Sequence, residues 1–264
     1  MCSDGETSHG EWLADRLHRR GWKLKVIGFI RDQESYLNSR YTQLVKRLVI
    51  RCDFPTYTTR VMQGESISEC DLMILFNWLN ELPAVERVMI PFGVSTDHHG
   101  RGHLTRPDPF QQLAEELALP ETVISRCKTA RSHNQQPGRL GVALALEISG
   151  FLERYQPIAL KHHSEKLRGG IERMARTNGW PAEPFNGLDS SIQKAIRHRY
   201  QASNAEFCRC FWPEMTWSEL FASQRKEACE PSRTSEVENI ELEACRRKII
   251  ADNLSAQMLI ELPG

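Results

Sequence analysis

Hydrophobic and polar positions follow two patterns along the chain, one typical of buried strands and one typical of amphipathic helices. The run Lys23–Ile30 is apolar on both faces from Val26 onward, which predicts a strand buried within a parallel sheet. Arg87–Phe92 has the same character and predicts a second buried strand. Tyr57–Val61 is a candidate third strand because of the β-propensity of its residues. The expected sheet is therefore short and parallel.

Most of the remaining chain predicts helices. Trp12, Leu13 and Leu17 recur at helical spacing before the first strand, within Glu11–Arg20. Asp32 is positioned to cap a helix from Gln33 to about Ile50. The other expected helices cover Asp71–Leu82, Pro109–Leu119, Leu140–Tyr155, Ser164–Arg176, Ser190–Phe211 and Val237–Leu259.

These elements together indicate an α/β fold, in which a short parallel sheet is flanked by helices and the C-terminal part is helix-rich. We predict an α/β domain with its helical C-terminal part over residues 1–221. Residues 222–264 are predicted to be a charged linker and a C-terminal helix. The first helix leads into a buried parallel strand with no strand before it. We therefore expect a fold that lacks its first strand.

Composition and charge contribute by excluding classes of protein. The 264 residues contain 34 Lys and Arg against 34 Asp and Glu, so the formal net charge is zero. A protein that coats nucleic acid without sequence preference would be expected to carry an overall positive charge. No apolar run approaches the roughly 18–20 residues that a membrane-spanning helix needs. The eight cysteines lack the spacing of a disulfide framework, which indicates free thiols in a reducing compartment. We expect a cytoplasmic protein with no nucleic-acid or membrane partner.

Arg31 and Ser39 form the strongest candidate site. Arg31 directly follows the first predicted strand, at the edge of the sheet where ligands of open α/β folds bind. Ser39 comes eight residues later, about two turns into the next helix. A guanidinium fork and a hydroxyl donor suit a phosphate group. Arg and Ser at this spacing occur four times in the chain. Only in this pair does the Arg follow a predicted strand and the Ser lie on the predicted helix after it.

The segment that contains both residues resembles a known family. Lys25–Tyr41, together with Gln43 and Lys46, is similar to the 3′-phosphate-binding segment of P-loop-type sulfotransferases, and is closest to bacterial sulfotransferase-like proteins. In that family the Arg and the Ser contact the 3′-phosphate of 3′-phosphoadenosine 5′-phosphosulfate. The resemblance assigns these roles to Arg31 and Ser39. Looser similarity covers Val88–Phe92, Pro107–Phe110, Ser203–Asn204 and Phe211–Pro213.

The resemblance implies transfer of a sulfuryl group from 3′-phosphoadenosine 5′-phosphosulfate to a hydroxyl of a saccharide or small molecule. The family's Lys- and Thr-containing loop for the 5′-phosphosulfate has no counterpart, because no Gly-Lys-Ser/Thr sequence follows a strand. The glycine-containing segments Gly138–Gly141 and Arg168–Gly170 precede or lie in predicted helices. The protein would thus have a truncated P-loop fold. It would be inactive as a sulfotransferase unless an upstream segment or a partner chain supplies the loop.

No residue is assigned as the catalytic acid or base, and Asp4, Glu6 and His9 are the nearest options by position. The alternative hypothesis is a non-catalytic remnant or interaction protein that retains the fold without the chemistry. We expect no metal site. His99 and His103 have a zinc-binding spacing only on a helix, which the intervening glycines disfavour. The neighbouring Cys208 and Cys210 would point about 200° apart on a helix.

Overall fold

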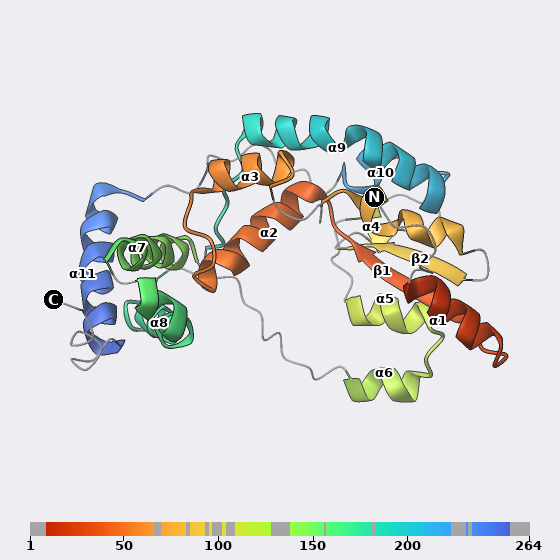
Figure 1. Ribbon diagram of the computed structural model, residues 1–264, viewed down its shortest axis with the longest axis horizontal. Coiled ribbons are helices and arrows are strands. Elements are labelled where there is room, and N and C mark those ends of the chain that lie inside the picture. The colour runs from red at the N-terminus through yellow and green to blue at the C-terminus, as the bar shows by residue number, and fades with distance from the viewer. Residues whose placement is uncertain are drawn as a thin grey trace. The chain divides into compact units, whose positions relative to one another are not determined.

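The computed structural model describes the chain in separate stretches: residues 9–65, 70–82, 85–92, 95–96, 102–103, 109–127, 138–155, 157–180, 183–222, 231 and 234–253. The chain forms two compact units (Figure 1). The first unit comprises Met1–Gln33, Ser66–Ala130 and Ile196–Glu227. The second comprises Glu34–Glu65, Arg131–Ala195 and Ala228–Gly264. Each unit combines segments that are far apart in the sequence, and the boundary predicted after residue 221 stays a prediction.

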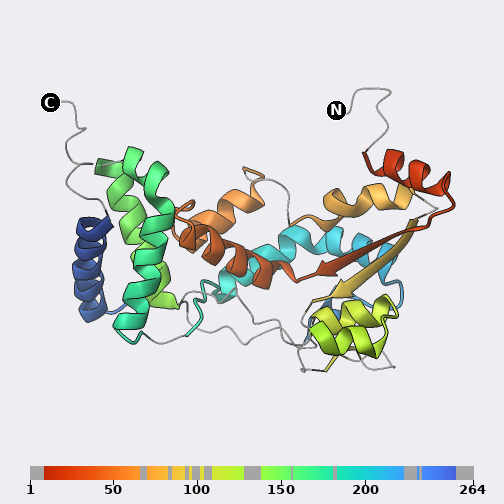
Figure 2. The ribbon, with the colours of Figure 1, turned by 90° about the horizontal axis from the view of Figure 1, so that it is seen from below.

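The first unit contains the parallel sheet. Strand β1 (Leu24–Ile30) pairs in parallel with β2 (Val85–Pro91), from Leu24 opposite Val85 to Ile30 opposite Pro91 (Figure 2). This pairing confirms the prediction of a short parallel sheet flanked by helices, although β2 begins at Val85 rather than Arg87. A second, antiparallel pair joins β3 (Ser95–Thr96) to β4 (Gly102–His103).

Helices of the first unit surround this sheet. The helix predicted over Asp71–Leu82 is divided, because Phe76 has a φ of −120° and a 3-10 turn begins after it. Asp71 caps the first half by accepting a hydrogen bond from Ile74 N at 3.3 Å. The helical elements are α1 (His9–His18), α4 (Leu72–Phe76), the 3-10 helix η1 (Asn77–Glu81), α5 (Pro109–Glu116), α6 (Glu121–Cys127), α10 (Trp217–Leu220) and the part of α9 (Ser190–Phe211) from Ile196 onward.

One face of the sheet carries the core of the first unit. Alternate side chains of a strand point to opposite faces, and those on this face meet α4, α9 and α10. On the other face, Lys25 reaches Glu116 of α5 at 2.8 Å. The buried core residues are Ile30, Leu72, Leu79, Leu82, Val85, Met89, Phe207, Cys208, Leu220 and Phe221.

The regular elements that the structure describes in the second unit are all helices. The helix that follows the first strand ends earlier than the predicted Ile50, because Leu48 adopts a left-handed φ of 59° and its N–H bonds to Val45 O at 2.8 Å. The helices are α2 (Gln33–Lys46, in this unit from Glu34), α3 (Phe54–Met62), α7 (Arg139–Tyr155), α8 (Pro157–Thr177), the start of α9, and α11 (Glu236–Asn253).

The candidate third strand at Tyr57–Val61 is wrong, because these residues belong to α3. Asp53 caps this helix by accepting a hydrogen bond from Thr56 N at 2.9 Å, and Pro55 occupies its first turn. Tyr57 and Val61 are four residues apart and both buried, as one face of a helix requires. Helix capping therefore outweighs the β-propensity of the side chains.

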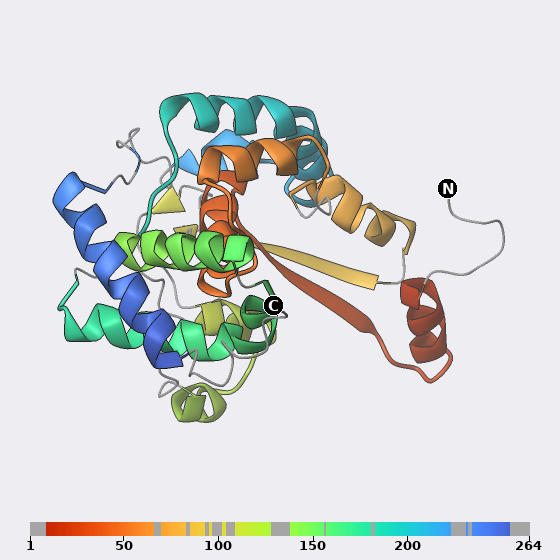
Figure 3. The same ribbon diagram turned by 60° about the vertical axis from the view of Figure 1, so that its left-hand side comes forward.

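Helices α7, α8 and α11 pack against one another within the second unit (Figures 1 and 3). Their contacts bury Ile148, Leu152, Leu167 and Ile249 almost completely. Helix α11 begins at Glu236, one residue before the prediction, and residues 254–259 of the predicted helix lie outside the described residues. None of the described helices combines the length and apolar character that crossing a bilayer requires.

Candidate functional site

Arg31 lies at the carboxyl end of β1, as predicted. Because Ile30 is opposite Pro91, the parallel register makes Arg31 and Phe92 the next residues of the two strands. Phe92 N donates a hydrogen bond to Ile30 O at 2.6 Å, and the guanidinium carbon of Arg31 lies 4.5 Å from the centroid of the Phe92 ring. A cation–π contact uses the flat face of a guanidinium, whereas its N–H donors lie in the plane. The ring therefore orients the Arg31 fork at this edge of the sheet.

The contribution of Phe92 was not predicted from the sequence. The last residues of two paired parallel strands lie side by side. The pairing register of β1 and β2 would therefore have placed Phe92 next to Arg31, but the sequence alone does not give that register.

A buried pair of amides holds the chain just after Arg31. Gln33 Nε2 donates to Asn204 Oδ1 at 2.6 Å, and Asn204 Nδ2 donates back to Gln33 Oε1 at 3.0 Å. Gln33 Nε2 also lies 3.3 Å from Cys70 O. Both side chains are buried, so their polar groups depend on one another rather than on water. The pair connects α9 to the residues that follow β1 within the first unit.

Ser203, the neighbour of Asn204, makes a second polar connection in the first unit. Its Oγ donates to Asp71 Oδ1 at 2.5 Å and accepts from Met73 N at 3.4 Å. Asp71 is the residue that caps α4, so Ser203 supports that cap. The Ser203–Asn204 pair noted in the sequence therefore has a structural role, which joins α9 to α4 and to the end of β1.

Ser39 lies on α2 in the second unit, also as predicted, and is half-buried. Leu37, Tyr41 and Val45 form the buried face of this helix. The adjacent Asn38 donates through Nδ2 to Phe185 O at 2.9 Å and accepts from Gly187 N at 2.9 Å. These contacts fix the helix that carries Ser39 within its own unit.

Arg31 and Ser39 therefore occupy the elements expected of them, a strand end and the following helix. Arg31 belongs to the first unit and Ser39 to the second, and their joint binding of one phosphate stays a prediction. Lys46, which the sequence resemblance includes, lies 3.2 Å from Glu172 of α8. Its charge is thus balanced within the second unit.

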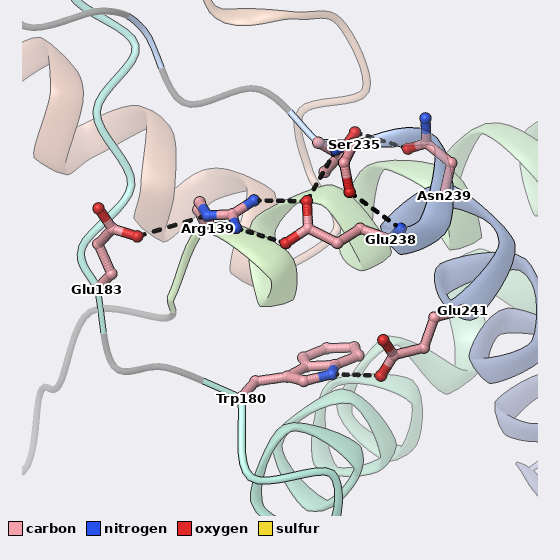
Figure 4. A network of polar contacts seen from close by, with 8 residues as sticks. Arg139, Trp180, Glu183, Ser235, Glu238, Asn239 and Glu241 are labelled. Carbon is pink, nitrogen blue, oxygen red and sulfur yellow. Dashed lines mark hydrogen bonds and ion pairs between the residues drawn. The ribbon is translucent and has the colours of Figure 1, made fainter.

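The two glycine-containing segments considered as phosphate loops do not connect a strand to a helix. Arg168–Gly170 lies inside α8, and Gly138 makes a single bridge to Pro184 just before α7. Figure 4 shows Arg139 held between Glu183 and Glu238. Two nitrogens of its guanidinium bind both carboxylate oxygens of Glu238, so these donors serve an ion pair of the second unit rather than a phosphate.

Glu238 has two structural roles at the start of α11. It accepts from Ser235 N at 2.8 Å while Ser235 Oγ accepts from Glu238 N at 3.2 Å, which forms a capping box (Figure 4). Hydrogen bonds from Arg139, and then from Ser235, lower the pKa of Glu238 to about 2. In the same network, Trp180 Nε1 donates to Glu241 Oε1 at 2.7 Å. Helix α11 is thus attached by polar contacts as well as by its apolar face.

The lowered pKa of Glu238 predicts an acid-dependent loss of stability. A carboxylate with a depressed folded-state pKa stabilises the fold above its ordinary value of 4.5, and this contribution disappears as pH falls toward about 2. We expect Glu238→Gln to lower the melting temperature at neutral pH and to flatten its decline across this range. Thermal melting from pH 7 to pH 2 measures both effects.

Glu236→Gln is the matched control, because Glu236 lies in the same first turn of α11 and its side chain is exposed. This variant should retain the pH dependence of the unmodified protein. Equal pH profiles for Glu238→Gln and the unmodified protein would contradict the structural role of the pair.

The remaining candidates do not form a second site. Burial raises the pKa of the Cys208 thiol to about 11, so this thiol stays protonated at neutral pH. Cys210 Sγ accepts a hydrogen bond from Asn80 and donates one to Glu206. Across the stretches that the structure describes, no three His, Cys, Asp or Glu residues are arranged to hold a metal ion. The candidates Asp4, Glu6 and His99 lie outside the described residues, as do the side chains of His9 and His103.

Comparisons of the chain with protein-family models, with characterised proteins and with solved structures gave no match. The resemblance to sulfotransferases therefore depends on the residues of the chain alone.

Proposed function

We propose that this chain binds a 3′-phosphorylated adenine nucleotide, with Arg31 as the main contact to the 3′-phosphate and Ser39 as a hydroxyl donor to the same group. The observation that carries the proposal is the position of Arg31 at the carboxyl end of β1, with its guanidinium oriented over Phe92. Ligands of open α/β sheets bind at this edge, and Arg is the preferred residue for a planar fork to phosphate.

The associated reaction is sulfuryl transfer from 3′-phosphoadenosine 5′-phosphosulfate to a hydroxyl of a saccharide or small molecule. A bond forms between the acceptor oxygen and sulfur, and the bond from sulfur to the 5′-phosphate oxygen breaks. The products are the sulfated acceptor and 3′-phosphoadenosine 5′-phosphate, and the acceptor proton leaves to a base. We assign neither that base nor the 5′-phosphosulfate loop to any described residue, and a partner chain is our candidate source of the loop.

Calorimetric titration with 3′-phosphoadenosine 5′-phosphate tests the binding step. The unmodified protein should bind this nucleotide more tightly than adenosine 5′-monophosphate, which lacks the 3′-phosphate. Arg31→Ala should weaken binding of the bisphosphate by about tenfold to a hundredfold, the usual effect of losing a charge-assisted hydrogen bond. Affinity for the monophosphate should change little.

Arg87→Ala is the matched control, since Arg87 lies on the same sheet and also contacts an aromatic ring, with its guanidinium carbon 5.9 Å from the centroid of Phe211. Arg87 precedes the carboxyl end of β2, so binding should be unchanged. The proposal fails if the unmodified protein binds neither nucleotide, or if Arg31→Ala binds both as the unmodified protein does. The first outcome would favour the non-catalytic interaction protein.

A further inference from the structure

Helix α1 is attached to the first unit through one of its sides. Gly10 lies against Trp78, so closely that a Cβ at this position would be 2.5 Å from the Trp78 ring. Ala14, one turn later, packs against the core of the first unit. The helix lies beside the amino end of β1, the end of the strand opposite to Arg31 (Figures 1 and 2). The other side of α1 faces away from this core.

This outward side of α1 carries an aromatic ring and a positive charge. Trp12 and Arg16 lie one turn apart on it, because each is about 160° around the helix from Ala14. The guanidinium carbon of Arg16 lies 5.1 Å from the centroid of the Trp12 ring. Trp12 is 53% exposed and the adjacent Leu13 is 41% exposed. Large apolar side chains exposed together are typical of a binding surface.

A second exposed indole follows the end of α1. Gly21 adopts a left-handed φ of 72°, and Trp22 N donates to Leu17 O at 3.0 Å, which is a Schellman ending. The residue after the glycine commonly packs back on the helix in such an ending, whereas Trp22 is 68% exposed. Neither Trp12 nor Trp22 donates through Nε1 to another residue that the structure describes. Each indole therefore offers apolar surface together with a hydrogen-bond donor.

Positive charge surrounds these two indoles. Residues 12–23 contain one acidic residue, Asp15, whose Oδ1 accepts a hydrogen bond from Arg19 Nε at 3.1 Å. Arg20 and Lys23 are exposed, and neither forms an ion pair within the described parts of the chain. The basic residues of this segment are Arg16, Arg19, Arg20 and Lys23. Because the whole chain has a formal net charge of zero, this positive charge is local.

We infer that Trp12, Arg16, Arg20, Trp22 and Lys23, the α1 surface, bind the face of an anionic phospholipid bilayer. Trp is the residue typical of the membrane–water interface, where its ring contacts apolar groups and its N–H meets headgroup oxygens. Basic side chains beside it are attracted to anionic headgroups. Each contribution is weak by itself, and reversible surface binding requires both together.

The geometry of the α1 surface favours a bilayer over a nucleic acid. Platforms that stack single-stranded bases lie in a basic groove that follows the phosphate backbone, whereas these side chains extend from the outward side of one helix. Surface binding also needs no apolar run long enough to span a membrane. The expectation of no membrane partner depended on the absence of such a run, so the α1 surface replaces that expectation for peripheral binding.

Cosedimentation of the full chain with vesicles tests the inference. The chain should bind phosphatidylcholine vesicles that contain about one third phosphatidylserine, and should not bind pure phosphatidylcholine. Binding should disappear as the salt concentration rises from about 0.1 M to about 1 M, because salt screens the attraction between charges. Arg20→Gln with Lys23→Gln should weaken binding by about thirtyfold, since each basic side chain near an anionic surface contributes about fivefold.

Arg126→Gln with Lys194→Gln is the matched control. These residues are exposed on α6 and α9, so the variant loses the same total charge without altering the α1 surface. It should bind the mixed vesicles as the unmodified protein does. Equal binding by the two double variants, or equal binding to vesicles with and without phosphatidylserine, would overturn the inference.

Fluorescence quenching identifies the side chains that enter the interface. Phosphatidylcholine brominated near the start of its acyl chains, mixed with phosphatidylserine, should quench part of the tryptophan fluorescence of the bound protein. Trp12→Phe with Trp22→Phe should abolish most of this quenching, although the other tryptophans still fluoresce. Undiminished quenching in this variant would show that another surface meets the bilayer. A chain that binds a single-stranded oligonucleotide but no vesicles would overturn the inference in favour of nucleic acid.

The α1 surface and the proposed nucleotide site can be tested separately. Strand β1 separates Lys23 from Arg31 by about 25 Å, at about 3.3 Å per residue. Arg20→Gln with Lys23→Gln should therefore leave the titration with 3′-phosphoadenosine 5′-phosphate unchanged, and Arg31→Ala should leave vesicle binding unchanged. Loss of vesicle binding in Arg31→Ala, in a protein with the circular dichroism spectrum of the unmodified chain, would contradict the assignment to the α1 surface.

Discussion

Phe207→Ala should lower the free energy of unfolding of the first unit by about 3–5 kcal/mol, the largest effect we expect from a single substitution. Phe207 is fully buried on α9, and its ring centroid lies 6.0 Å from that of Phe76, 4.6 Å from that of Phe211 and 5.2 Å from that of Trp212. Removing the ring leaves a cavity among rigid aromatic neighbours that cannot readily fill it. Urea denaturation followed by tryptophan fluorescence measures the change.

Ile74→Ala provides the control for this experiment. Ile74 lies on α4 of the first unit and is 64% exposed, so its truncation should change the free energy of unfolding of that unit by no more than about 0.5 kcal/mol. A loss below about 1 kcal/mol for Phe207→Ala would contradict its assignment to a well-packed core.

Asn204→Leu should lower the free energy of unfolding of the first unit by about 1–3 kcal/mol. The two side chains have similar shapes, so the main loss is polar. Gln33 loses both hydrogen bonds to Asn204 and retains only its 3.3 Å contact to Cys70 O. The buried Oε1 of Gln33 is left without a donor, and an unsatisfied buried polar atom costs more than the hydrogen bond itself contributes. Denaturation under the conditions used for Phe207→Ala measures the effect.

A double-mutant cycle separates this pair from its surroundings. Gln33→Met with Asn204→Leu replaces both amides by apolar groups of similar shape, so it should recover much of the stability lost in Asn204→Leu. Some loss should remain, because Cys70 O also loses a donor. Additive effects of the two substitutions would show that the amides are not coupled.

The same double variant also separates stability from binding. The amide pair follows Arg31 by two residues and fixes that stretch of backbone. Weaker binding of 3′-phosphoadenosine 5′-phosphate by a stably folded double variant would show that the amide pair helps to position Arg31.

Much of the secondary structure could be predicted from the sequence, because it depends on local signals. The predicted helix Ser190–Phe211 has the same ends as α9, and the predicted start at Pro109 is the start of α5. The error at Tyr57–Val61 arose where β-propensity and a helix cap disagreed. Asp53, as the N-cap, and Pro55, in the first turn, favour a helix more strongly than the side chains of this segment favour a strand.

The candidate site could be predicted in part. The position of Arg31 follows from the apolar strand before it, and that of Ser39 from the helix pattern after it. The ring of Phe92, the amides of Gln33 and Asn204, and the carboxylates around Arg139 could not be assigned, because each joins residues far apart in the sequence.

The sequence by itself determined most of the helices, the two strands of the parallel sheet, the position of a guanidinium after a buried strand, and the net charge of zero. Only the tertiary structure decided that β1 pairs in parallel with β2 and that the Arg31 guanidinium lies over the Phe92 ring. Local sequence patterns indicate which side chains of a segment are buried and how the ends of its helices are capped. Which segments lie next to one another is decided by long-range packing, which depends on register and on the chain entropy lost in bringing distant segments together.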